Sequence, residues 1–228
     1  MRRTPEINSF WDDDDPSLSQ ERQGRGPGSG PDLLVRHGQS QANVDGILES
    51  LGDSPLTETG RAQAQALARH LAQLDLAGVT VVASPLTRAA HTADEIASAL
   101  RTSLSYDHRL REGEVAGFEG VSFAEIEKKV SEAGKSYLDH ELHGGEAPKE
   151  IAARVKAALA EVRASGAETI ILVMHGYSLR MLAWSLYEGR EDGKFGESVA
   201  NCDAFEILLG PDGPIGPLKR LAPSAASA

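Results

Sequence analysis

The sequence predicts an α/β fold, a three-layer sandwich in which helices flank both faces of a mostly parallel central sheet. Short apolar runs rich in β-branched residues alternate with longer segments whose apolar residues recur at helical spacing. Two of these runs, residues 33–35 and 170–174, lead into a His-Gly pair, at His37 and at His175. Because ligands of open α/β sheets bind at the carboxyl ends of the strands, this recurrence indicates a functional site at one edge of the sheet.

The expected strands are short runs of buried character, and they cover residues 33–35, 79–83, 170–174 and 205–209. The expected helices each carry an apolar face, and those faces lie within residues 64–74, 90–100, 123–130, 151–162 and 179–186. This alternation of strands and helices favours a parallel sheet that is covered on both sides.

Local signals predict where three of the helices begin. Ser84 can cap a helix and Pro85 suits its first turn, so a helix is expected to open there. Ser122 followed by Glu125 is a capping box at the head of another helix. The inner face of that helix is expected to contain Phe123, Ile126 and Val130. A third helix is expected from about Pro148.

The length of the chain, 228 residues, fits one large domain, which we place at residues 32–221. Residues 1–31 contain a block of aspartates and a Gly/Pro-rich stretch, a composition that predicts a disordered tail. Residues 222–228 are expected to form a short flexible end.

Charge and composition exclude several classes of partner. The formal net charge of −11 argues against nucleic acid, which binds basic surfaces. No apolar run approaches the about 20 residues that cross a bilayer, and the N-terminus lacks the apolar core of a secretory signal. The one cysteine, Cys202, cannot form an intramolecular disulfide and fits the reducing cytoplasm. The sequence therefore predicts a cytoplasmic protein without nucleic-acid or membrane partners, and it specifies no oligomeric state.

Arginines and histidines gather at the expected strand ends. Arg36 and His37 follow the first strand, His175 follows the central strand, and Arg88 lies in the first turn of the helix behind Ser84. A first helical turn offers free N–H groups and the positive end of the helix dipole. Guanidinium groups stay protonated and match phosphate oxygens bidentately. Each residue alone is commoner in a turn or on the surface, but together they predict a phosphoryl-transfer site.

At this point the chain resembles the histidine phosphatase superfamily, which contains the cofactor-dependent phosphoglycerate mutases. The opening signature is Arg36-His37-Gly38, with Ser40 and Asn43 behind it. Five more blocks follow in the order of the family, at residues 56–64, 84–93, 110–120, 174–176 and 201–202. The resemblance covers residues 33–209, and it implies a phosphoglycerate mutase-like fold and the phosphatase branch of the superfamily.

The resemblance also implies a role for each matching residue. It makes His37 the nucleophile that becomes phosphohistidine. It makes Glu112 the proton donor to the leaving oxygen and then the base that activates water. The residues that it places against the phosphoryl group are Arg36, Asn43, Arg88, His175 and Gly176. Glu114 is the rival carboxylate, and the spacing to Gly117 and Gly120 favours Glu112.

The chemistry of the side chains agrees with these roles. An imidazole with an unperturbed pKa of about 6.5 is largely neutral at physiological pH, so one ring nitrogen can attack phosphorus. A covalent intermediate divides one difficult displacement into two easier steps. The transition state places charge on three equatorial oxygens, which Arg36, Arg88 and His175 can contact together. This cluster predicts a metal-independent enzyme that needs no cofactor.

The favoured function is hydrolysis of a small-molecule phosphate monoester, and three alternatives stay open. A phosphoglycerate mutase-type phosphomutase is less favoured, because the family's mutases carry extra arginines after the acid and residues 121–147 contain none. A catalytically inactive phospho-ligand binding protein is disfavoured because no core residue is lost. A metallohydrolase is disfavoured because no histidine pair has ligand spacing and Cys202 has no partner.

Substrate specificity is expected to come from the segment between Glu112 and Gly145. Its candidate pocket or lid residues are Phe118, Phe123, Tyr137 and His140. Of these, Phe123 is expected in the core, because it lies on the apolar face of its helix. The sequence does not identify the substrate itself.

Overall fold

The computed structural model describes residues 30–135, 143–188 and 199–222, and it confirms an α/β sandwich. A six-stranded sheet has the order β3-β2-β4-β1-β5-β8. Its strands are β1 (Asp32–Arg36), β2 (Val79–Ala83), β3 (Leu104–Tyr106), β4 (Thr169–Met174), β5 (Ala204–Ile207) and β8 (Lys219–Ala222). The first four strands run parallel to one another, and β5 and β8 extend the sheet in antiparallel pairing. The expectation of a mostly parallel sheet is therefore confirmed.

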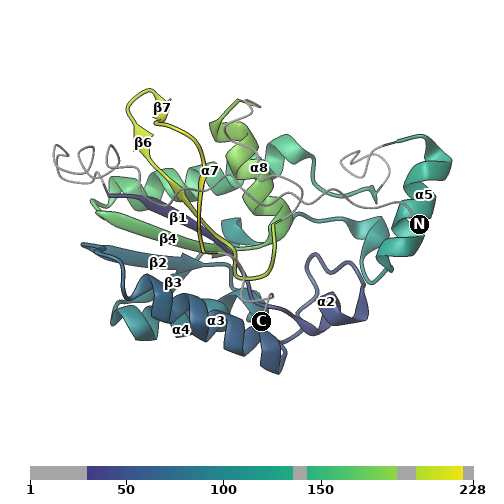
Figure 1. The fold of residues 1–228 in the computed structure, drawn as a ribbon. Helices are drawn as coiled ribbons and strands as arrows, with labels where there is room; N and C mark the ends of the chain where they lie inside the picture. The colour runs from purple at the N-terminus through teal and green to yellow at the C-terminus, as the bar shows by residue number, and fades with distance from the viewer. Residues whose placement is uncertain (1–29, 136–142, 189–198, 223–228) are drawn as a thin grey trace, which may run out of the picture.

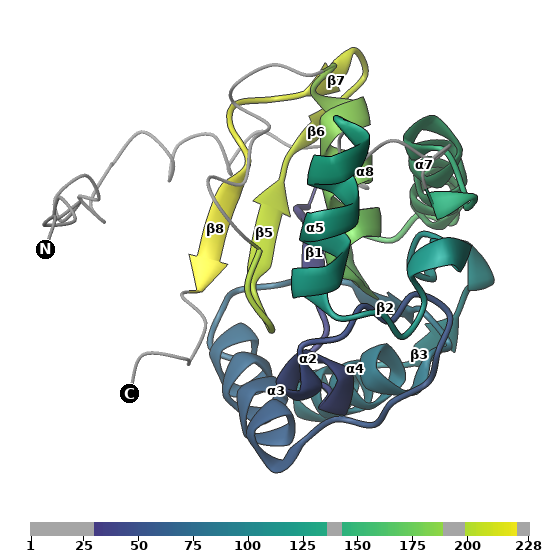
Figure 2. The ribbon, with the colours of Figure 1, turned by 90° about the vertical axis from the view of Figure 1, so that its right-hand side faces the viewer.

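Helices cover both faces of this sheet, as Figures 1 and 2 show. The longer helices are α3 (Glu58–Leu71), α4 (Thr87–Leu100), α5 (Phe123–Ala133), α7 (Pro148–Ala164) and α8 (Gly176–Leu186). Because successive strand residues point to opposite faces, β1 contributes to two cores. Leu33 and Val35 pack with α3 and α4, whereas Leu34 packs with α7 and α8. The two cores fix the sheet between its helical layers.

Shorter elements lie beyond the carboxyl ends of the parallel strands. They are α2 (Gln41–Asp45) and the 3-10 turns η2 (His108–Leu110) and η3 (Ala116–Phe118). The longer helix α5 stands apart from the sheet (Figure 1). An isolated bridge between Ile47 and Ser122 joins the end of α2 to the start of α5. Beyond β5, a two-stranded sheet pairs β6 (Leu209–Gly210) with β7 (Gly213–Pro214).

The helix after β2 begins later than the sequence predicts. Its first residue is Thr87, and Leu86 precedes it without a side-chain cap. Ser84 does not cap the helix, because its hydroxyl accepts a hydrogen bond from the Leu86 amide and contacts His175 instead. Asp53 takes the capping place, accepting from the amide and the hydroxyl of Thr87 at 2.5 and 2.7 Å. The helix start is thus held by a loop 34 residues earlier in the chain.

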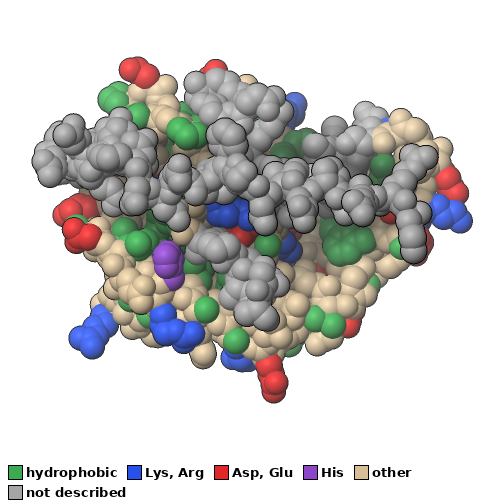
Figure 3. All heavy atoms as spheres, in the orientation of Figure 1, with side chains coloured by type: hydrophobic (Ala, Val, Ile, Leu, Met, Phe, Trp, Pro, Cys, Tyr) green, Lys and Arg blue, Asp and Glu red, His purple; other side chains and the backbone are tan. Residues whose placement is uncertain are grey.

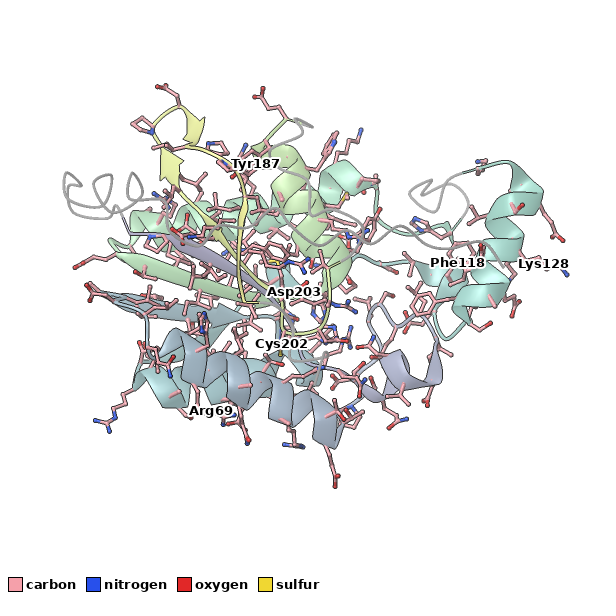
Figure 4. The ribbon with its side chains drawn as sticks, viewed as in Figure 1. Arg69, Phe118, Lys128, Tyr187, Cys202 and Asp203 are labelled. Atoms are coloured by element: carbon pink, nitrogen blue, oxygen red, sulfur yellow. The ribbon has the colours of Figure 1, made fainter. Side chains whose placement is uncertain are left out.

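Of the two phenylalanines near α5, Phe118 and not Phe123 lies in the core. Phe118 is buried, and it packs with Val115 and Ile126 in a small core beneath α5. Phe123 is 49% exposed, so the expectation that it lies in the core is wrong. Figure 4 shows Phe118 on the side of α5 nearer the sheet and Lys128 on the outer side. The apolar face of α5 is therefore narrow, formed by Ile126 with partial burial of Val130.

The expected tails lie largely outside the described residues, so the prediction of disorder for residues 1–31 and 222–228 stays a prediction. Within the described ranges, no helix is both long and apolar enough to cross a membrane. Acidic and basic side chains are interspersed over the visible part of the face in Figure 3, with neither sign gathered into one patch.

Candidate active site

His37 directly follows β1, and its ring is held in one tautomer. Its amide donates to the carbonyl of Met174 in β4, which seats the residue at the carboxyl end of the sheet. The ring Nδ1 lies 2.7 Å from the carbonyl oxygen of Gly38. A carbonyl oxygen can only accept, so Nδ1 carries the hydrogen and Nε2 keeps its lone pair. Burial and the charges of Arg36 and Arg88 lower the pKa of His37 well below 6.5, so the ring is neutral at physiological pH.

The loop that follows His37 packs so closely against α3 that Gly38 has no space for a side chain. The Gly38 amide donates to the Thr92 hydroxyl of α4 at 3.0 Å. A Cβ atom on Gly38 would lie 2.5 Å from the carbonyl oxygen of Gly60 at the start of α3, and a Cβ on Gly60 would collide with the carbonyl of Gln39. The nucleophile loop therefore rests directly on the backbone of α3.

His175 is the residue before α8, is fully buried and faces His37 edge to face, with ring centroids 5.1 Å apart. Its Nε2 lies 2.9 Å from the Ser84 hydroxyl oxygen. The Ser84 oxygen also accepts from the Leu86 amide. When the serine hydroxyl gives its hydrogen to Nε2, the ring hydrogen of His175 is on Nδ1, which has no partner among the described residues. Burial, with the charges of Arg88, His37 and Arg36, lowers the pKa of His175 well below 6.5.

Arg36 is the last residue of β1, and its guanidinium group uses Nη1 for a backbone contact while its Nε is left without one among the described residues. Nη1 donates to the carbonyl of Val199 at 2.6 Å, and Nε is buried without a partner in the described parts of the chain. A Cβ atom on Gly176 would lie 3.4 Å from this Nε, so the first residue of α8 sits against the guanidinium. Burial lowers the pKa of Arg36, and the charge of Glu112 opposes that effect.

Arg88, in the first turn of α4, is 2% exposed and is held by the loop at residues 49–52. Its Nη1 donates to the Glu49 carboxylate at 2.9 Å and to the Gly52 carbonyl at 2.7 Å. Its Nη2 donates to the Ser50 carbonyl at 3.0 Å. Glu119 holds this loop in turn, accepting from the amides of Ser50, Leu51 and Gly52. The sequence showed no sign of these contacts, because the loop has no motif of its own.

Glu112 lies between η2 and η3, and its carboxylate is placed at the N-terminus of α8. It accepts from the amides of Tyr177 (3.0 Å), Ser178 (2.8 Å) and Gly113 (2.9 Å). The first amides of a helix have no partner within the helix and attract a negative charge. Glu112 thus binds the amides two and three residues after His175. Burial lowers the pKa values of Arg36 and Arg88, and the charge of Glu112 opposes that effect. The Glu114 amide and carbonyl bond Glu146, and within the described ranges its carboxylate accepts no hydrogen bond from α8.

Two asparagines connect α2 to the nucleophile. Asn43 Oδ1 accepts from the Ser40 amide at 3.1 Å, which completes a capping box, and from Asn201 Nδ2 at 3.0 Å. The same Asn201 nitrogen lies 3.1 Å from the His37 carbonyl. The next residues, Cys202 and Asp203, bond the backbone of Arg36 and lie at the end of the sheet in Figure 4. The sequence marked Asn201 as part of a family block, but it gave no indication of this bridge.

The structure thus brings the candidate residues together at one end of the sheet. His37 and His175 are in contact, both arginines act electrostatically on them, and Glu112 acts on both arginines. Tyr137 and His140, the other pocket or lid candidates, lie outside the described residues.

Comparison with known proteins gives one consistent result. The family model described as histidine phosphatase superfamily (branch 1) matches residues 33–215. A Hydrogenobacter thermophilus protein that carries a phosphoserine phosphatase name is 34% identical over 155 residues, 65% of this chain and 74% of the relative. A Proteus mirabilis protein named a probable phosphoglycerate mutase is 36% identical over 155 residues, 65% of this chain and 71% of the relative.

A solved structure agrees with the sequence relatives. The structure of a mycobacterial glucosyl-3-phosphoglycerate phosphatase with VO3 superimposes with a TM-score of 0.71 at 25% identity. The match covers 87% of this chain and 100% of that one. The match of the family model over most of the domain, the two relatives and the shared fold lead to one conclusion: the chain belongs to the histidine phosphatase superfamily.

Proposed function

We propose that this protein is a cytoplasmic phosphatase that hydrolyses a small-molecule phosphate monoester through a phosphohistidine on His37, without a metal. The observation that carries the proposal is the state of the His37 ring. A buried imidazole whose Nδ1 bonds the Gly38 carbonyl, and whose pKa two arginines lower, presents a neutral Nε2 with its lone pair free. That is the state in which a histidine attacks phosphorus.

In the first step, the Nε2 lone pair of His37 attacks phosphorus as the bond from phosphorus to the leaving oxygen breaks. The free Nε edge of Arg36 and the Nδ1 hydrogen of His175 bind the phosphoryl oxygens. Arg88 contributes its buried positive charge. The resemblance to the family adds Asn43 and the Gly176 backbone as further contacts to the phosphoryl group. Glu112 gives a proton to the leaving oxygen, so the product departs as an alcohol.

In the second step, the Glu112 carboxylate takes a proton from water while the water oxygen attacks phosphorus. The bond between phosphorus and Nε2 breaks, inorganic phosphate leaves, and His37 returns to its neutral form. The Glu112 carboxylate accepts from the amides of Tyr177 and Ser178 in the first turn of α8, the helix that His175 precedes, and this supports Glu112 over Glu114.

A phosphomutase is the second candidate, and the relative named a phosphoglycerate mutase favours it. Both activities use the same phosphohistidine, and they differ in whether water or a second substrate hydroxyl accepts the phosphoryl group. The absence of arginine between residues 121 and 147 supports hydrolysis.

The test is a screen of phosphorylated metabolites, phosphoserine and 3-phosphoglycerate included, with purified protein and released phosphate as the readout. We expect steady phosphate release, an acid-labile phosphoryl label on His37 after rapid quenching, and loss of both in His37→Ala. Isomerisation of 3-phosphoglycerate without phosphate release would identify a mutase. Full turnover by His37→Ala would refute the covalent mechanism.

A further inference from the structure

Arg154 of α7 binds the backbone of the segment that carries Glu112. Its Nη1 donates to the carbonyls of Arg109 (2.6 Å) and Arg111 (2.8 Å), and its Nη2 donates to the carbonyl of Glu112 (2.9 Å). Its Nε and Nη2 also bond the two carboxylate oxygens of Glu146, at 2.8 and 2.9 Å. The side chain is 11% exposed, and all five of its N–H groups have an acceptor.

Glu146 binds the same segment from its other side. One carboxylate oxygen accepts from Arg111 Nη2 at 3.1 Å, and the other accepts from the Glu114 amide at 3.1 Å. The Glu146 amide donates to the Glu114 carbonyl at 2.9 Å. Burial raises the pKa of Glu146, but the hydrogen bonds and charges of Arg154, Glu114 and Arg111 outweigh burial and lower it. Glu146 therefore stays ionised and keeps Arg154 in place.

These contacts enclose Glu112 between two fixed points. Arg154 binds the backbone carbonyl of Glu112, and the first amides of α8 bind its side-chain carboxylate. Gly113 packs so closely against Ile151 of α7 and Tyr177 of α8 that a Cβ there would lie 2.5 and 2.7 Å from them. The position of the carboxylate thus depends on how this loop is seated between the two helices.

We propose that Arg154 and Glu146 form a positioning pair for Glu112, setting the carboxylate for proton transfer to the leaving oxygen. This inference rests on the proposed phosphatase function. Neither residue touches the phosphoryl group. A displacement of a reacting group by about 1 Å can cost about a hundredfold in rate, so a loss of the pair acts on catalysis through geometry.

The effect of such a displacement depends on the leaving group. Phenyl phosphate releases a phenol that needs a proton, whereas p-nitrophenyl phosphate releases a phenolate that is stable without one. Misplacing Glu112 must therefore slow phosphorylation of His37 by phenyl phosphate more than by p-nitrophenyl phosphate. A general loss of stability slows both equally.

The experiment measures the first-step rate on both substrates by rapid-quench single turnover in Arg154→Ala, Arg154→Lys and Glu146→Gln. Arg163→Ala is the matched control, because Arg163 is also on α7 and pairs with buried Asp32, which begins β1 at the end opposite to His37. In Arg154→Ala we expect a loss of about tenfold or more on phenyl phosphate and of about threefold or less on p-nitrophenyl phosphate. Arg154→Lys keeps the positive charge but not the planar set of five N–H donors. It should show an intermediate loss of rate, again larger on phenyl phosphate than on p-nitrophenyl phosphate.

A double-mutant cycle completes the test. If Arg154 acts through Glu112, then Arg154→Ala in a Glu112→Gln background should cause no further loss on phenyl phosphate. Equal losses on both substrates in all three variants, or additive losses in the double mutant, would overturn the positioning role. Failure of the wild type on both substrates would instead overturn the proposed function, on which this role depends.

Discussion

An Asp32→Asn substitution is expected to remove a pH dependence of stability that the wild type carries between about pH 4 and pH 7. Asp32 opens β1 and is 1% exposed. One carboxylate oxygen pairs with Arg163, and the other has no hydrogen-bond partner in the described residues. Burial raises the pKa of Asp32 from 3.8 to about 6, and Arg163 only partly offsets that rise.

The sign follows from proton linkage. A raised pKa means that the folded protein holds this proton more tightly than the unfolded chain does. The stabilisation is therefore complete below the unfolded pKa of 3.8, and it is lost as pH rises through about 6. The difference of 6 − 3.8, about two pKa units at about 1.4 kcal/mol each, corresponds to roughly 3 kcal/mol in the free energy of unfolding. Asparagine stays neutral, so its contribution to the free energy of unfolding does not change with pH.

The measurement is the free energy of urea unfolding for wild type and variant across that pH range. Other carboxylates contribute to both proteins, so the informative quantity is the difference between them at each pH. The free energy of unfolding of the variant, relative to that of the wild type, should rise by about 2 to 3 kcal/mol from the acid end to the neutral end of the range. A difference that stays flat, or that moves in the opposite direction, would refute the reasoning about Asp32.

Three further predictions concern catalysis and the N-terminal segment. Glu112→Gln should slow hydrolysis of an alkyl phosphate about a hundredfold while affecting p-nitrophenyl phosphate much less, and a larger loss from Glu114→Gln would reassign the acid. Activity should persist in excess chelator, and loss that a divalent ion reverses would show that a metal takes part. Deleting residues 1–29 should leave turnover and melting temperature unchanged, and a drop of more than about 5 °C in the melting temperature would show that these residues dock on the domain.

The sequence predicted the parts of the fold that rest on strong local patterns. The strands at 79–83 and 170–174 and the apolar faces of α3, α4, α7 and α8 are where periodicity placed them. It missed β3, because Leu-Ser-Tyr is short and largely exposed, and β8, because Lys219–Ala222 is an edge strand with charged residues. Such edge strands are specified by pairing with a neighbour rather than by their own composition.

The same contrast holds for the site. Arg36, His37 and His175 followed strands and Arg88 lay in a first helical turn, so topology was enough to predict that these four converge. Glu112 lies in a loop between two 3-10 turns, and only the resemblance to the family indicated it. The supporting contacts could not be predicted in this way. Arg88 is held by carbonyls of residues 49–52, and Arg154 by carbonyls of residues 109–112, and a backbone carbonyl leaves no mark in a sequence. Ser84 was misread because a serine before a proline is an ordinary helix cap, whereas here it bonds a histidine 91 residues away.

The contact between Gly38 and Gly60 has a consequence for how this protein tolerates mutation. Neither glycine has a positive φ, so their backbones suit any residue and only space excludes a side chain. Gly46 and Gly134 are the opposite case, with φ of 64° and 60° and open space around them. In a library that samples every residue at these positions, asparagine should survive at Gly46 and Gly134. Even alanine should be lost at Gly38 and Gly60, because one methyl group there would push the nucleophile loop off helix α3.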